Sequence, residues 1–332
     1  MQLSPKFIKA IDLFTNSTSL LIYAIFIGSC VGLLWPSSGD QVSEFIDPTI
    51  LVLVFLLLLE VPIKGLFKGV TNVKFLTLAW VTNFLIIPFI GYIIASIFLS
   101  GEPLFYTGLI IYFMAPCTDW FLGFTRLAKG NVELGAALLP INMISQLVLF
   151  PAYLSIFDTV VAYKIDLSAL LQWVIQPLLG AIVIRLIAHK FTKQLSGFCQ
   201  VTIPVTLALL VGLIFTSNIT ELTAHLNVVP VLLTAIFIFL VVTFLLSEGI
   251  SKVTKLGYPE HCLLTFTTGA RNAPMMLGLA TIAIPDQPLI YATITMGMLI
   301  EFPHLTALKV LLLKRRGKSV EKNTTEPTTV SS

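Results

Sequence analysis

The chain has 332 residues, of which 56% are hydrophobic and only 11% are charged. Soluble domains carry about 25% charged residues, and the mean hydropathy here is +0.94. This composition excludes a cytosolic enzyme, a disordered chain and a nucleic-acid-binding protein, because so few charges cannot cover a soluble surface. The net charge of +3 is small and matters only through its placement.

Apolar runs separated by charged residues, Pro or Gly predict ten membrane spans, since each spanning helix needs about 20 apolar residues. In chain order the predicted spans are 18–35, 48–63, 75–99, 104–127, 132–157, 167–187, 201–217, 228–247, 260–284 and 289–312. They use nearly the whole chain and leave no room for a soluble catalytic domain. The remaining residues 317–332 are rich in Ser, Thr, Lys and Glu, which predicts a disordered cytoplasmic tail.

The basic residues predict the orientation. With the N-terminus placed in the cytoplasm, all of the 20 basic residues except Lys164 and Arg271 fall in cytoplasmic segments, and the outer loops carry acidic residues instead. This asymmetry is what the positive-inside rule requires. We therefore predict a multi-pass protein of the plasma membrane with both termini in the cytoplasm.

The order of the spans indicates an internal repeat. Residues 1–160 and 161–316 each hold five spans, so the second set enters the membrane from the opposite side, as in many secondary transporters. The fifth and tenth spans each carry Phe-Pro, at Phe150–Pro151 and Phe302–Pro303. The predicted fold class is an all-α polytopic membrane protein with two inverted five-helix repeats.

The fourth and ninth spans contain matching interruptions, "MAPCTDW" and "TTGARNAPMM". Pro116 and Pro274 each remove a backbone donor and clash with the preceding turn, and Gly269 adds conformational freedom. Broken helices persist in a membrane only where they line a cavity or pack on protein. The simpler alternative is that each proline only kinks its helix.

Ionisable residues at membrane depth are costly and usually functional. Asp119 and Arg271 lie at the two interruptions, and Glu301 lies in the tenth span. A salt bridge between Asp119 and Arg271 is geometrically plausible if the two spans cross. Such a pair either opens during the transport cycle or is a static connection that holds the crossing together.

Three uncharged polar or sulfur-containing residues complete the candidate site. Cys117 lies inside the fourth-span interruption, where a thiol can act as a soft ligand. Asn142 and Gln146 are one helical turn apart on the fifth span and therefore share a face. These amides either bind a polar solute or hold helices together.

At these residues the sequence resembles a known family. The segments "APCTDWFLGFTRLAKGN" and "LLPINMISQLVLF" resemble the fourth and fifth helices of the arsenite permeases, which belong to the bile acid/arsenite/riboflavin transporter superfamily. The third-span segment "WVTNFLIIPFIGYIIA" also fits the superfamily, and "GARNAP" is similar to its Gly-x-x-Asn element, with Asn272 at the matching position. The resemblance covers nearly all of residues 15–316.

The resemblance implies ten helices, with the fourth and ninth broken and crossing, and a panel of helices 1, 2, 6 and 7 beside a core of helices 3–5 and 8–10. It implies export of arsenite or antimonite in exchange for protons, with Cys117 as the thiol that binds the metalloid. The substrate-binding residues are then expected to be Cys117, Asn142, Gln146, Arg271 and Asn272.

The sequence departs from the family pattern at two places. Met275 stands where the arsenite permeases have a glutamate, so Asp119 is a candidate for the proton-coupling carboxylate. Thr267 and Arg271 take the places of the Glu and Gln of the sodium-coupled branch, whose other sodium ligands fall on Phe121 and Leu122. Sodium coupling is therefore less expected than proton coupling or an anion-binding role for Arg271.

The alternative function is an ion-coupled carrier of a small organic anion, with Arg271 facing the carboxylate. An enzyme is not expected, because HExxH, GxSxG and paired catalytic aspartates are absent from the sequence. The four cysteines do not form a disulfide or metal-binding pattern. We therefore expect no cofactor, no metal site, no nucleic acid and no obligate protein partner, only a small solute, a coupling ion and the lipid bilayer.

Overall fold

The computed structural model describes residues 17–60, 72–117, 120–157, 176, 179–185, 187 and 192–325. Within these residues the chain is helical, and its only β-type pairing is one isolated bridge. The helices are α2 (Ser17–Leu34), α3 (Ser38–Ser43), α4 (Ile46–Glu60), α5 (Val73–Val81), the π-helical turn η2 (Thr82–Ile86), α6 (Ile87–Leu99), α7 (Pro103–Met114), α8 (Trp120–Leu127), α9 (Val132–Phe157), α11 (Thr192–Ala224), α12 (Val229–Thr254), α13 (Tyr258–Gly269), α14 (Ala273–Ala283) and α15 (Pro288–Thr325).

Five helical segments of the described chain are long and apolar enough to cross a membrane. They are Val73–Leu99, Val132–Phe157, Gly197–Thr220, Val229–Thr254 and Pro288–Arg316. Ser19–Leu34, Pro103–Met114 and Ala273–Ala283 are shorter apolar helices. The prediction of an all-helical protein with several membrane-spanning helices is confirmed for the described residues, whereas the ten spans and the inverted repeats stay a prediction.

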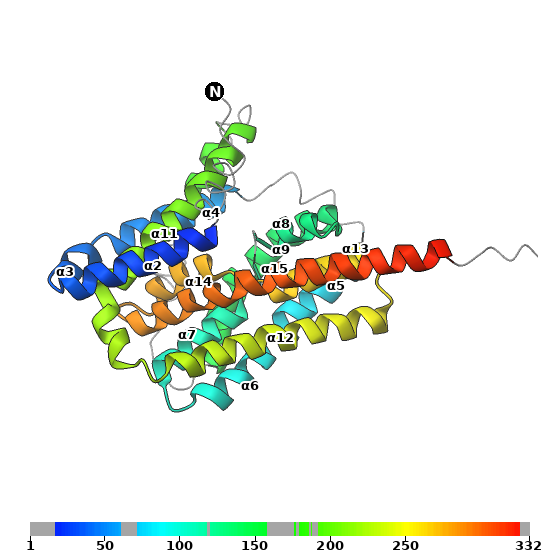
Figure 1. Ribbon diagram of the computed structural model, residues 1–332. Helices are drawn as coiled ribbons and strands as arrows, with labels where there is room; N and C mark the ends of the chain where they lie inside the picture. The colour runs from blue at the N-terminus through cyan, green and yellow to red at the C-terminus, as the bar shows by residue number, and fades with distance from the viewer. Residues whose placement is uncertain are drawn as a thin grey trace, which may run out of the picture.

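One group of helices consists of α2, α4 and α11, which lie side by side with α3 at one end (Figure 1). A Cβ atom on Gly28 would come within 2.4 Å of the Gly212 carbonyl oxygen, and one on Gly32 would come equally close to that of Thr216. Small residues therefore let α2 and α11 approach backbone to backbone, which is how helices pack in membranes.

The other helices, α5–α9 and α12–α15, form the larger part of the molecule (Figure 1). The helix α15 contacts α7, α12 and α14, and also reaches α11. Its close approach to α7 depends on Gly297, because a Cβ atom there would lie 2.5 Å from the Tyr112 ring. This contact places Tyr112 near Glu301, which lies one helical turn after Gly297.

Some helix boundaries differ from the predicted ones. The sixth predicted span, 167–187, lies mostly outside the described residues, although Arg185 donates from Nε to the Leu59 carbonyl at 2.8 Å. The helix α15 continues to Thr325, beyond the predicted end of the tenth span at residue 312, and the predicted disorder of residues 317–332 stays a prediction. Lys, Glu and Val have ordinary helix propensities, and nothing before Pro327 stops the helix. In Figure 1 the end of α15 extends beyond the neighbouring helices.

Candidate functional site

Two helices are interrupted, and their interruptions pair with each other. The helix α7 ends at Met114 before α8 begins, and α13 ends at Gly269 before α14 begins. The extended residues between them form an antiparallel bridge between Pro116 and Arg271. Cys117 donates its N–H to the Ala270 carbonyl at 3.0 Å, and Asn272 donates to the Ala115 carbonyl at the same distance. The crossing thus pairs backbone groups that the helix breaks would leave unsatisfied.

The three residues expected to break the helices lie at different points of these interruptions. Pro116 is in the extended segment, so its missing N–H costs no helical hydrogen bond. Gly269 is the last residue of α13, and its φ is not positive. Pro274 lies in the first turn of α14, where proline favours the start of a helix.

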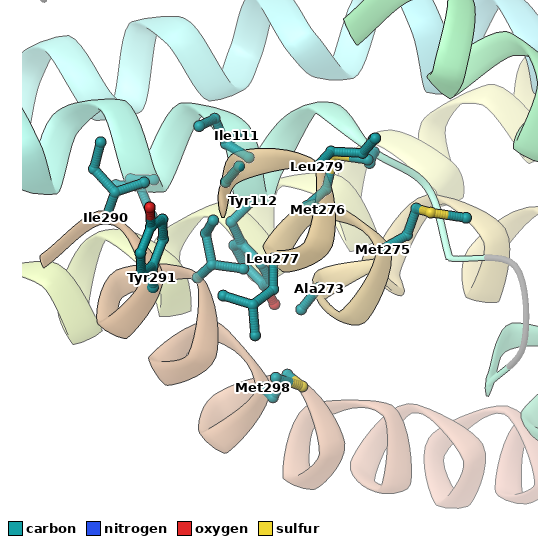
Figure 2. Close-up of a cluster of buried hydrophobic side chains, with 14 of the residues drawn as sticks. Ile111, Tyr112, Ala273, Met275, Met276, Leu277, Leu279, Ile290, Tyr291 and Met298 are labelled. Carbon is teal, nitrogen blue, oxygen red and sulfur yellow. The ribbon is translucent and has the colours of Figure 1, made fainter. Parts of the chain in front are cut away.

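The side chain of Asn272 caps the N-terminus of α14. Its side-chain oxygen accepts the N–H of Met275 at 3.3 Å, which makes Asn272 the N-cap of this helix. Figure 2 shows the first turns of α14, with Ala273, Met275 and Met276, next to Tyr112 of α7 and Met298 of α15. Met275, at the position where the resemblance to the arsenite permeases implies a glutamate, is buried.

The Arg271 guanidinium binds main-chain carbonyls at the ends of two helices. Its side chain is 1% exposed. One terminal nitrogen donates to the Phe113 carbonyl of α7 at 3.1 Å. The other donates to the carbonyls of Thr267 and Thr268 in α13, at 3.2 and 2.6 Å. The guanidinium carbon also lies 5.7 Å from the centre of the Phe239 ring.

Glu301 reaches the same crossing from α15. One carboxylate oxygen accepts the backbone N–H of Arg271 at 3.0 Å, and the other accepts the Tyr112 hydroxyl at 2.8 Å. The side chain is fully buried. Asp119, the predicted partner of Arg271, lies outside the described residues. The structure therefore brings Glu301 and Arg271 together through the main chain of Arg271.

Cys117 is buried directly at the crossing. Its sulfur accepts the backbone N–H of Trp120 at 3.2 Å, at the start of α8. It packs in a cluster with side chains from α8, α13 and α15, among them Phe121, Phe266 and Leu305. The thiol thus lies where the two broken helices meet.

Two amide side chains meet at Thr267, one turn before Arg271. The Thr267 hydroxyl oxygen accepts the Asn83 amide at 3.0 Å and the Asn142 amide at 3.3 Å. Gln146 lies one turn further along α9 and is also buried. The sequence singled out Asn142 and Gln146, and the structure adds Asn83 and Thr267.

These amides keep several buried atoms without a hydrogen-bond partner among the described residues. The amide atoms are Asn83 Oδ1, Asn142 Oδ1, Gln146 Oε1 and Gln146 Nε2. The guanidinium atom Arg271 Nε also has no partner among the described residues. Buried polar groups are normally paired, and each one that is not requires an explanation. The set contains both acceptors and donors, which suits a solute that carries hydroxyl groups.

The sequence pattern does not mark Asn83 as a site residue, because the position of its side chain depends on a local irregularity of the helix. It lies in η2, where the Ile87 N–H bonds the Thr82 carbonyl five residues earlier. Pro88 has no N–H for the Phe84 carbonyl, and the Tyr153 hydroxyl of α9 donates to that carbonyl instead, at 2.5 Å. Single π-helical turns of this kind are frequent at functional sites, and Asn followed by Pro five residues later is the only signal in the sequence.

Thr267→Val is expected to destabilise the protein and to impair its transport. Valine has nearly the same shape but offers no acceptor, so the Asn83 and Asn142 amides lose their shared partner. A buried polar group without a partner costs about 1–3 kcal/mol. Thermal unfolding in detergent measures the loss. Thr268→Val is the matched control, because the Thr268 hydroxyl bonds only carbonyls of its own helix. Equal stability of the two variants would contradict the role of Thr267.

The described residues contain no group of His, Cys, Asp or Glu that could hold a metal ion.

The family of the chain follows from a comparison of its sequence with models of known protein families. A model of the sodium bile acid symporter family matches residues 48–225, more than half of the chain. The chain belongs to this family. The resemblance inferred from the sequence motifs is thereby confirmed at the level of the family.

Two curated relatives of the chain are named arsenical-resistance protein Acr3. The relative from Corynebacterium glutamicum is 23% identical over 320 residues, which cover 88% of this chain and 85% of the relative. The relative from Alkaliphilus metalliredigens is 26% identical over 289 residues, which cover 75% and 78%. A symporter family consists of transporters of small solutes, in agreement with a multi-pass membrane protein.

Proposed function

We propose that this member of the sodium bile acid symporter family exports arsenite or a related metalloid hydroxide across the plasma membrane in exchange for protons. Both curated relatives bear names that refer to arsenical resistance. The observation that carries the proposal is the buried thiol of Cys117 at the crossing of two broken helices. A thiolate is the soft ligand that a trivalent metalloid prefers.

The amides around Thr267 complete the proposed substrate site. A trivalent metalloid hydroxide presents hydroxyl groups that both donate and accept hydrogen bonds. The unpaired oxygens of Asn83, Asn142 and Gln146 can accept from such groups, and Gln146 Nε2 can donate to them. Asn272 and Arg271 hold the crossing in place beside this site.

The exchanged proton needs a carboxylate, and Glu301 is our candidate within the described residues. It is buried, contacts both Tyr112 and the Arg271 backbone, and lies at the crossing. Asp119 remains a second candidate from the sequence. Both residues would couple proton movement to the same pair of broken helices.

The arrangement of the spans in the membrane is part of the same proposal. We infer ten spans in two inverted five-helix repeats with both termini in the cytoplasm. The grouping of α2, α4 and α11 beside the other helices supports a panel and a core, and the distribution of basic residues supports the orientation.

A carrier of small organic anions is the less favoured function. It requires Arg271 to present its guanidinium to a carboxylate. Both terminal nitrogens of Arg271 instead bond main-chain carbonyls of α7 and α13. Labelled carboxylates are therefore expected to accumulate poorly compared with arsenite.

Transport into everted membrane vesicles tests the proposed function. Vesicles from an arsenite-sensitive bacterium that expresses the chain are expected to accumulate arsenite when respiration acidifies their interior. Nigericin, which collapses the pH gradient, is expected to abolish the accumulation. Accumulation no greater than in vesicles without the protein would contradict arsenite export, and accumulation that survives nigericin would contradict proton exchange.

A further inference from the structure

Two helices end at one buried point, and both direct their last carbonyls toward it. The Phe113 carbonyl belongs to the last turn of α7, and the Thr267 and Thr268 carbonyls belong to the last turn of α13. The C-terminus of a helix carries roughly half a negative elementary charge. Two such ends at one place together carry about one negative elementary charge, which one positive charge would neutralise.

The chain itself supplies that charge. The Arg271 guanidinium bonds all three of these carbonyls, at distances between 2.6 and 3.2 Å. The Phe239 ring covers the guanidinium, and this ring stacks on Phe113 at 3.8 Å between ring centres. The cation is thus enclosed by carbonyl oxygens and an aromatic face, which are groups that also bind free cations.

We propose that Arg271 is a resident cation that fills a cation site formed by the ends of α7 and α13, so that this chain needs no sodium ion at the crossing. The name of its family refers to sodium. A free ion must lose its hydration shell to enter such a site, whereas a tethered guanidinium occupies it as the chain folds. The inference on transport rests on the proposed function, but occupation of the site itself does not.

Thermal unfolding of the purified protein tests occupation without any substrate. The unfolding temperatures of the natural chain and of Arg271→Ala are compared in choline chloride, sodium chloride and choline chloride with millimolar guanidinium, at equal ionic strength. The natural chain is expected to unfold at the same temperature in all three. Arg271→Ala is expected to unfold at a lower temperature in choline and to regain stability with sodium or guanidinium.

Arg315→Ala is the matched control, because Arg315 pairs with Glu248 near the end of α12 and is partly exposed. It is expected to show no specific response to either cation. If Arg271→Ala does not fold, Arg271→Gln serves in its place, since glutamine keeps one amide donor for the carbonyls. Stabilisation of the natural chain by sodium, or absence of any cation response in both Arg271 variants, would overturn the proposal.

The transport arm uses the same vesicles as the arsenite assay. Arsenite accumulation by the natural chain is expected to be equal in sodium and choline media, and that of Arg271→Ala to fall to background in choline and recover with guanidinium. A failure of arsenite transport in the natural chain refutes the proposed function and leaves the unfolding result to decide on the cation site. Sodium-dependent arsenite transport by the natural chain refutes the resident cation.

Discussion

Cys117→Ser is expected to abolish arsenite resistance in a sensitive bacterial host. Serine retains an acceptor for the Trp120 N–H, which now bonds the Cys117 sulfur, so the start of α8 is preserved. What disappears is the soft sulfur ligand at the crossing. We expect arsenite transport to fall by at least about tenfold, which corresponds to about 1.4 kcal/mol of binding free energy.

Cys262→Ser is the matched control for this experiment. Cys262 is equally buried and lies in α13, but its sulfur faces the Ala128 carbonyl at 3.9 Å, away from the crossing. This variant is expected to keep most of the resistance, provided that its amount in the membrane equals that of the natural chain. Resistance that survives in Cys117→Ser at the same membrane level would show that the thiol does not bind the metalloid.

Glu301→Gln is expected to separate substrate exchange from proton coupling. Glutamine fits the same volume, and its oxygen can still accept the Arg271 N–H while its amide donates to the Tyr112 hydroxyl oxygen. It cannot take up or release a proton. Accumulation driven by a pH gradient is therefore expected to fall about tenfold or more, as when a proton-transfer group is removed. Exchange of labelled for unlabelled arsenite at equal concentrations is expected to continue.

The two assays together distinguish a coupling role from a structural one. Loss of both pH-driven accumulation and arsenite exchange would assign Glu301 to the integrity of the crossing. Unchanged accumulation would remove it from the coupling mechanism and leave Asp119 as the remaining candidate. Glu133→Gln provides the control, because Glu133 is an exposed acid in the first turn of α9.

Part of this fold and site follows from the sequence alone. The apolar runs predict most helices, and Pro116 and Pro274 with their polar neighbours locate both interruptions. The partners of Arg271 could not be predicted in the same way. Among the described residues, which do not include the predicted partner Asp119, the guanidinium bonds carbonyls. Every residue has a carbonyl, so such partners leave no pattern in the sequence. Their positions depend on how α7 and α13 meet in space.

Asn83 and the end of α15 illustrate two other limits. Asn83 reaches Thr267 because of a π-helical turn whose freed carbonyl is bonded by Tyr153, a residue far along the chain. The combination exists only after α9 has packed. In α15, the composition of the sequence did not indicate where the helix ends, because a helix that is already formed continues at little cost through residues of ordinary propensity.

The pairing at the crossing also has a mechanical consequence. Two main-chain hydrogen bonds join the Ala115–Cys117 segment to the Ala270–Asn272 segment. The hydrocarbon core of a bilayer contains no water that could replace these bonds. We expect these segments to move as one rigid body and their amides to exchange hydrogen slowly. Alternating access would then arise by sliding between the α2, α4 and α11 group and the remaining helices. The extended backbone between the broken helices would be the fixed pivot of that motion.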